Sequence, residues 1–184
     1  MRTIRTDLAV EAHEYYTQGG SKIPQGVQME EQEIDGCKVT RVRIDSEEGE
    51  KALHKPKGEY ITVEIRDVMR LSAQGQQAAS GIVARQIGQL LEQNAIGPED
   101  EILVIGLGNW DITPDALGPK TISKLCVTRH LLEYMPEVVE KGTRSVCAIS
   151  PGVLGITGIE TGEIVRGVVE RVKPKAVIAI DAFP

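Results

Sequence analysis

The segment from Glu101 to Pro119, EILVIGLGNWDITPDALGP, constrains the fold more than any other stretch of this chain. It opens with an uninterrupted apolar run, Ile102–Ile105, which is typical of a strand buried on both faces of a parallel sheet. Gly106 and Gly108 come next, and a residue without a Cβ lets the backbone turn sharply there. Because open α/β sheets bind ligands at the carboxyl ends of their strands, we expect a ligand site in the loop that follows.

Four polar side chains occupy this loop, on Asn109, Asp111, Thr113 and Asp115. Pro119 suits the first turn of the helix that ends the loop. The pattern Gly106-x-Gly108 after a strand also suggests a dinucleotide fingerprint. Asp111 stands where the third glycine would be, however, and its charge would face the pyrophosphate. A tight strand-to-loop turn explains both glycines, and we expect Asp111 to form an Asx-turn.

Strands and helices alternate along most of the chain. The dipeptide Asp35-Gly36 separates two weakly alternating segments and is a strong hairpin signal. The expected elements are strands at 27–34, 38–44, 59–65, 145–149 and 176–180, and helices at 68–94, at 120–134 and after the capping-box pattern at 157–160. The sequence therefore predicts an α/β fold in three layers. A mostly parallel sheet would carry helices on both faces, with an N-terminal β-hairpin at its flank.

Asp115 and Asp181 form the sharpest pair of candidate catalytic residues. Each follows a buried strand, and carboxylates at strand ends on one edge of a sheet can converge on one crevice. Two close carboxylates share a proton, so one can act as a base on water while the other acts as an acid. The ordinary alternative is that Asp115 caps a helix and Asp181 is a loop residue. Spacing alone favours this alternative, because capping aspartates are common.

Composition limits the partners and the compartment. The chain has 184 residues, 41% of them hydrophobic, which suits one α/β domain with an appendage. Its net charge of −6, without a strong basic stripe, argues against nucleic-acid binding. It has no apolar segment long enough for a membrane and no signal-peptide core, so we expect a cytoplasmic protein. The three cysteines lack metal-ligand spacing, so no metal or disulfide is expected, and Cys126 and Cys147 should be buried.

Four blocks of sequence resemble the spore germination protease family, the endopeptidases that degrade small acid-soluble spore proteins. The blocks are GLGNWDITPDALGPK, TRHLLEYMPE, SPGVLGITGIET and VIAIDA, in the family's order and at matching separations. The resemblance extends from about Arg5 to Ala182. Because family chains continue far beyond this C-terminus, the chain is expected to lack the C-terminal half.

The resemblance implies an atypical aspartic-type endopeptidase that is unrelated in fold to pepsin. Its sheet would be similar to that of hydrogenase maturation proteases, in the phosphorylase/hydrolase-like fold. The motifs place the catalytic aspartates at Asp115 and Asp181, and they imply hydrolysis by an activated water without a metal, a cofactor or a covalent intermediate. The resemblance further implies small acid-soluble spore proteins as substrates, a homo-oligomer and a location in the spore interior. The surrounding substrate loop would comprise Gly106, Gly108, Asn109, Asp111 and Thr113.

The family is made as a zymogen that removes its own N-terminal segment, at a site similar to Thr-Glu-(Phe/Ile)-Ala-Ser-Glu. Residues 6–11 of this chain, TDLAVE, have an acid, an apolar residue, an alanine and a second acid at the corresponding positions. The resemblance therefore implies self-cleavage between Asp7 and Leu8. The expected organisation is a propeptide at 1–7, an N-terminal arm and hairpin region at 8–66, and an α/β catalytic core at 67–184.

Three other functions stay open. Peptidyl-tRNA hydrolases also have GLGN after their first strand and TRH further on, but here Trp110-Asp111 replaces their Pro-Gly. A truncated, non-catalytic paralogue could bind spore proteins or a full-length protease. The hydrogenase maturation proteases have a similar loop with a nickel-binding acid, and this interpretation predicts nickel binding at Asp115.

Overall fold

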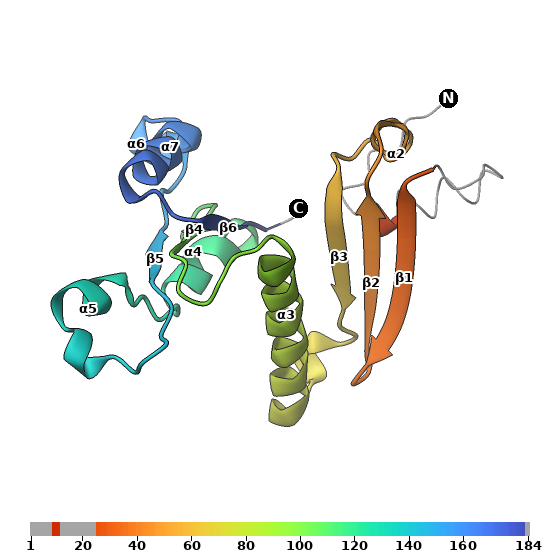
Figure 1. Ribbon diagram of the computed structural model, residues 1–184, viewed down its shortest axis with the longest axis horizontal. Coiled ribbons are helices and arrows are strands. Elements are labelled where there is room, and N and C mark those ends of the chain that lie inside the picture. Colours follow the sequence, from red (N-terminus) through yellow and green to blue (C-terminus); the bar gives the residue numbers. More distant parts are fainter. Residues whose placement is uncertain (1–8, 12–24, 183–184) are drawn as a thin grey trace. The chain divides into compact units, whose positions relative to one another are not determined.

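The computed structural model describes residues 9–11 and 25–182. These residues fall into two compact units that divide between Gln93 and Asn94. The first unit contains an antiparallel sheet and the second a parallel sheet, so the chain is an α/β protein (Figure 1). The expected division into 1–7, 8–66 and 67–184 stays a prediction. Within the described ranges, no helix has both the length and the apolar character that a membrane span requires.

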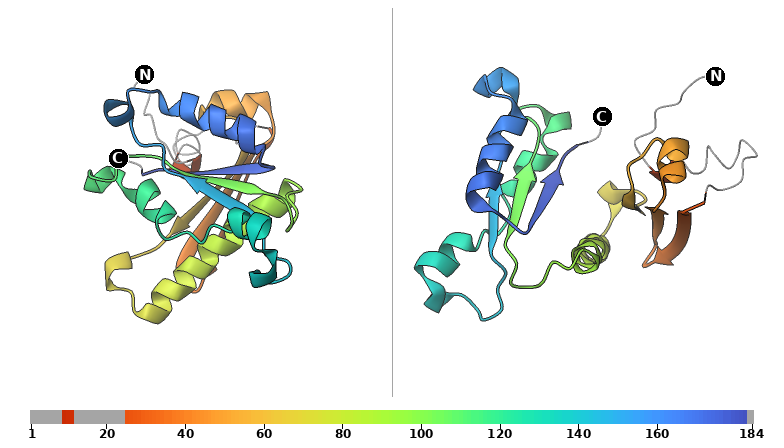
Figure 2. Two further views of the ribbon diagram at one scale, coloured as in Figure 1. Left: turned by 90° about the vertical axis from the view of Figure 1, so that its left-hand side faces the viewer. Right: turned by 45° about the horizontal axis from the view of Figure 1, so that its top comes forward.

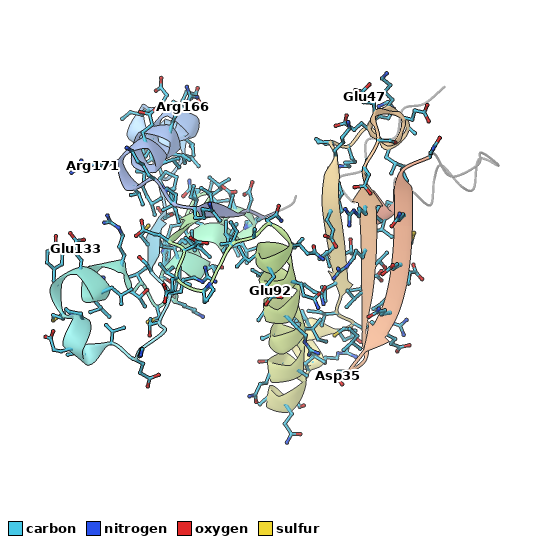
Figure 3. All side chains as sticks on the ribbon, in the orientation of Figure 1. Asp35, Glu47, Glu92, Glu133, Arg166 and Arg171 are labelled. Carbon is cyan, nitrogen blue, oxygen red and sulfur yellow. The ribbon has the colours of Figure 1, made fainter. Side chains whose placement is uncertain are left out.

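The antiparallel sheet of the first unit has three strands in the order β1-β2-β3. They are β1 (Val27–Ile34), β2 (Cys37–Ile44) and β3 (Gly58–Glu64). Asp35 and Gly36 join β1 to β2 with φ angles of 49° and 78°, as a type I′ hairpin turn requires. The predicted hairpin is therefore confirmed, and Figure 3 shows Asp35 at its turn.

Helices cover both faces of this sheet. Helix α2 (Glu47–Leu53) contributes Leu53 to a core cluster with Val42 and Ile44 on one face. On the other face, α3 (Ala73–Gln93) contributes Ala79 and Ile82 to a second cluster. A single 3₁₀ turn, η1 (Val68–Arg70), precedes α3. The sheet with its two helices therefore has a core of its own.

The position of β3 corrects the sequence prediction. The strand was expected at the start of the parallel sheet, but it pairs antiparallel with β2, with Val63 opposite Val39. Its alternation of Tyr60, Thr62 and Glu64 with Ile61 and Val63 is the pattern of an antiparallel strand, whereas a doubly covered parallel strand is apolar throughout. The mostly parallel sheet is therefore smaller than predicted, and the antiparallel strands form a sheet of their own rather than a flanking hairpin.

The second unit contains a parallel sheet in the order β5-β4-β6. Its strands are β4 (Ile102–Gly106), β5 (Val146–Ile149) and β6 (Ala176–Ile180). The central strand β4 is buried at every residue, as its apolar run predicts. The helices are α4 (Leu117–Ile122), α5 (Arg129–Tyr134), α6 (Leu154–Thr157) and α7 (Thr161–Val172), with 3₁₀ turns η2 (Thr113–Asp115) and η3 (Pro136–Val138). Figures 1 and 2 show α4 and α7 on opposite faces of this sheet.

Two predicted helices differ from the structure. The helix expected at 120–134 is divided into α4 and α5, because the Thr128 N–H leaves the helical pattern and donates to the Val146 carbonyl at the start of β5. The expected capping box at 157–160 is absent from the start of α7. Thr157 ends α6 instead, and its hydroxyl accepts the Ile159 N–H at 3.1 Å.

The cysteines also differ from expectation. Cys126 is exposed and Cys147 is half-buried, whereas Cys37 in β2 is buried. Cys126 follows the end of α4 in the segment that connects it to α5, so the apolar periodicity that placed it inside a long helix does not apply.

Candidate functional site

The backbone of α4 passes directly over the carboxyl end of β4. A Cβ built on Gly106 would lie 2.5 Å from the Gly118 carbonyl carbon, and one built on Gly118 would lie 2.6 Å from the Ile180 carbonyl oxygen. Both separations are far shorter than van der Waals contact, so the approach requires glycine at each position. Leu107 N–H also donates to the Ile180 carbonyl oxygen at 2.8 Å. The loop before α4 is therefore held next to the ends of both β4 and β6.

Within this loop the Asp115 side chain lies against Gly108. The Asn109 N–H donates to Asp115 Oδ2 at 2.8 Å and to the Asp115 carbonyl oxygen at 3.0 Å. Gly108 has a φ of +111°, and a Cβ there would lie 2.9 Å from Asp115 Oδ1. The two glycine-dependent turns and the shared N–H thus fix the carboxylate at the end of the central strand, where it is half-buried.

Asp181 follows the last residue of β6, the neighbour of β4. Its side chain is exposed, and its Oδ1 accepts the Ala182 N–H at 2.9 Å. The residue before it, Ile180, forms the hydrogen bond to Leu107 and contacts Gly118. Asp115 lies three residues before Gly118 in the sequence. Both aspartates are therefore within a few residues of one backbone junction at the carboxyl edge of the parallel sheet.

The other loop residues have distinct roles. Asn109 makes the Asx-turn, because its Oδ1 accepts the Asp111 N–H at 3.0 Å. This corrects the expectation that Asp111 forms it. The Asp111 and Thr113 side chains are exposed beside the site, whereas Gly106 and Gly108 permit the close approaches described above.

The TRH segment lies at the opposite edge of the parallel sheet. Thr128 Oγ1 accepts the Val146 N–H at 2.9 Å, and Arg129 Nε lies 3.1 Å from Glu101 Oε2. Glu101 and Val146 stand at the amino ends of β4 and β5. Since β4 has five residues, its two ends are about 13–16 Å apart. The structure thus gives Thr128 and Arg129 a role in fixing the start of the sheet, away from Asp115.

The carboxyl edge carries the carboxylates of Asp115 and Asp181, the Thr113 hydroxyl, and the Ser150 hydroxyl, which donates to the Gly106 carbonyl oxygen at 3.2 Å. Among the described residues, no group of three or more His, Cys, Asp or Glu side chains is arranged to hold a metal ion. Two carboxylates on neighbouring strand ends can exchange a proton with a water placed between them.

Sequence reasoning missed a hollow beside Asp115. Thr113, Ala116 and Leu117 contribute to its lining, and so do Lys120 in α4 and Lys124, which lies just past the end of that helix. The two lysines can be seen in the sequence. They identify a site only when the loop that carries Asp115 is known to fold next to them. Gly118 was also missed as a packing residue.

Fold and site together define an α/β protein with a pair of candidate catalytic carboxylates at the carboxyl edge of a parallel sheet. Comparison with known proteins is more specific. The chain belongs to the germination protease family, whose family model matches residues 5–184.

Several relatives named germination protease resemble the chain over nearly its whole length. The protein of Clostridium acetobutylicum is 43% identical over 100% of this chain and 56% of its own length. The protein of Clostridium tetani is 48% identical over 98% of this chain and 55% of its own. The protein of Caldanaerobacter subterraneus is 50% identical over 98% of this chain and 54% of its own. The chain therefore spans about half the length of the curated relatives it matches.

Proposed function

We propose that this chain carries the catalytic residues of an endopeptidase that degrades small acid-soluble spore proteins during spore germination. Membership of the germination protease family supports both the peptidase activity and the role in spore germination. The carboxylates of Asp115 and Asp181 at the carboxyl edge support the aspartic-type chemistry. The protein would act in the cytoplasm of the spore interior.

The observation that carries the mechanism is the junction of Gly118 with Ile180, beside which both aspartates stand. In the proposed reaction one carboxylate of the pair Asp115 and Asp181 takes a proton from a water, which attacks the peptide carbonyl carbon. The other carboxyl group supplies a proton to the amine that leaves as the C–N bond breaks. The Asn109 N–H orients Asp115 throughout.

We further propose that the chain is a zymogen that cleaves itself between Asp7 and Leu8. Both residues lie outside the described part of the chain. The sequence 6–11, TDLAVE, supports this site, because it combines an acid, an apolar residue and a second acid in the pattern given above.

Intact mass spectrometry of the purified chain at mildly acidic pH tests both proposals. We expect the wild type to lose residues 1–7 with time, and Asp115→Asn and Asp181→Asn to keep them. The side-chain amide oxygen that Asp115→Asn introduces can still accept the Asn109 N–H, so the loop geometry is preserved while the titrating group is lost. Asp35→Asn is the matched control, because the Asp35 side chain is exposed, lies outside the site and forms no hydrogen bond or ion pair with the described residues, and asparagine also suits its hairpin turn. It should be processed at the wild-type rate.

Two results would contradict the proposal. Processing that persists in both Asp115→Asn and Asp181→Asn would assign the cut to a contaminating protease. An intact wild-type chain would show that this polypeptide does not process itself, and it would favour the non-catalytic paralogue that binds spore proteins. Asp7→Lys tests the cleavage site independently of the catalytic residues. It should abolish processing although Asp115 and Asp181 are unchanged.

We also infer a homo-oligomer from the family resemblance. Light scattering of the purified chain is the direct measurement. We expect a mass that is a multiple of the 20.0 kDa chain, and a mass of one chain would contradict the inference.

A further inference from the structure

The hollow beside Asp115 has a volume of about 520 Å³, within the range of sites that bind small ligands or side chains. It begins at Thr113 and Ala116, which flank Asp115 on either side in the sequence, and continues along α4 and past its end at Ile122 to Leu125. A substrate peptide whose scissile bond lies at Asp115 would therefore have the residues on either side of that bond within reach of this hollow.

Among the residues that the structure describes, two lysines line the hollow and no acidic residue does. Lys120 lies in α4 and Lys124 lies two residues past its end, and two ammonium groups that line the same hollow repel each other. Neither ammonium forms an ion pair with any acidic side chain in the described ranges, whereas Arg41 and Arg129 pair with Glu59 and Glu101. In a chain with a net charge of −6, this concentration of unpaired positive charge favours an anionic occupant.

The remaining lining is mostly apolar. Leu117 is 54% exposed in the hollow, and Ala116 and Leu125 add to the same surface. An inorganic anion would leave this surface in contact with water. An occupant that satisfies the whole hollow must present a negative group and an apolar group close together.

We propose that this hollow selects the substrate by binding an acidic side chain on Lys120 and Lys124 and an adjacent apolar side chain on Leu117 and Leu125. The occupant is an extended peptide segment with an acidic residue and an apolar residue next to each other. The chain contains such a segment itself, at Asp7-Leu8. This inference rests on the proposed function, because it assigns specificity to the same site.

The test measures peptide binding in the Asp115→Asn chain, which cannot cut if the proposed mechanism holds. A fluorescent peptide with the sequence of residues 3–14 is compared with its Asp7→Asn and Leu8→Lys forms. We expect the dissociation constant to rise about three- to tenfold for either change, and the Asp7 effect to shrink as salt is added.

Charge reversal makes the test specific to the two lysines. The Lys120→Glu/Lys124→Glu variant should bind the Asp7→Lys peptide more tightly than the parent peptide, inverting the wild-type preference. Lys120→Gln/Lys124→Gln should remove the preference without inverting it. Lys141→Glu is the matched control, because it places the same charge change on another exposed lysine, outside the hollow. It should bind the peptides as the parent does.

The outcomes separate this inference from the proposed function. Equal binding of the parent peptide and its Asp7→Asn form, or an unchanged preference in the charge-reversed variant, would overturn the inference. Cleavage of the parent peptide by the chain that retains Asp115 is measured separately. If cleavage is unchanged when both lysines are substituted, the proposed peptidase activity is supported and the proposed selectivity of the hollow is refuted. If binding depends on the lysines but no cleavage occurs, the peptide-binding site is supported and the proposed catalysis is refuted.

Discussion

At the residue scale, Gly108 determines where the Asp115 carboxylate lies. Its φ of +111° is in the region that favours glycine, and a Cβ there would overlap the Asp115 carbonyl oxygen. Gly108→Ala combines backbone strain with a steric clash. We therefore expect the free energy of unfolding to fall by about 2–3 kcal/mol, with loss of the proposed self-cleavage. Urea denaturation and intact mass are the two measurements.

Gly142→Ala is the matched control for this substitution. Gly142 has a φ of +89°, but a Cβ there would meet no heavy atom within 4 Å. The free energy of unfolding of this variant should fall only by the cost of backbone strain, about 1 kcal/mol, and the variant should still process itself. Equal losses in the two variants would show that the contact with Asp115 has no role in holding the loop.

Cys147 in β5 gives a pH-dependent contribution to stability. Burial, with Glu101 adding to it, raises the pKa of the Cys147 thiol above its ordinary value of 9.0. The folded protein then holds this proton more tightly than the unfolded chain. The contribution is therefore complete below about pH 9 and declines as the pH rises from there through the folded-state pKa.

The measurement is urea denaturation of the wild type and Cys147→Ala across this pH range. The free energy of unfolding should fall more steeply above about pH 9 in the wild type than in the variant. Burial also raises the pKa of Tyr60, but this contribution is present in both proteins and cancels in the comparison. Parallel pH profiles would contradict the prediction.

At the element scale, Thr128 joins the segment between α4 and α5 to the start of β5. Its hydroxyl accepts the Val146 N–H at 2.9 Å and donates to the Arg144 carbonyl oxygen at 2.5 Å. Thr128→Val keeps the shape of the side chain but leaves a strand N–H without its acceptor. We expect a loss of about 1–3 kcal/mol in the free energy of unfolding, measured by urea denaturation. Thr128→Ser restores the hydroxyl and should recover most of this loss; if it does not, the methyl packing is what matters.

The elements that the sequence predicts well are those with local signals. The turn at Asp35-Gly36 needs positive φ at adjacent positions, and the residue types meet this requirement without reference to the rest of the chain. Strand β4 is apolar throughout because both of its faces are covered. The same reasoning placed Asp115 after a buried strand, as β4 is, and Asp181 after another, although no residue of β6 is buried.

The elements that the sequence predicts poorly depend on distant partners. The pairing of β3 with β2 is a choice between two sheets, and its alternating pattern was the one local sign of it. The break between α4 and α5 follows from hydrogen bonds to Val146, eighteen residues beyond Thr128. Helix α2 is short, and only the Ser46 cap, whose hydroxyl accepts the Gly49 N–H at 3.0 Å, marks its start. The hollow beside Asp115 requires the loop and α4 together.

At the scale of the whole molecule, each unit has one central strand, β2 in the first and β4 in the second. Val42 and Ile44 in β2 are 1% exposed and Leu103 in β4 is 1% exposed, whereas α5 and α7 contain no buried residue. Figure 3 shows Glu133 on α5 and Arg166 and Arg171 on α7. Opening a central strand breaks hydrogen bonds to two neighbours and exposes fully buried apolar side chains, whereas the apolar side chains of α5 and α7 are at most partly buried.

Native-state hydrogen exchange should therefore show two maxima of protection along the chain rather than one. We expect the amides of β2 and β4 to exchange slowest and those of α5 and α7 to exchange faster by at least about a hundredfold, which corresponds to about 2.7 kcal/mol of opening free energy. Val42→Ala, a core truncation in the first unit, should reduce protection in β1, β2 and β3. If α7 were protected as strongly as β4, it would have to pack against more than its burial indicates, and the assignment of β4 as the stable centre of the second unit would be wrong.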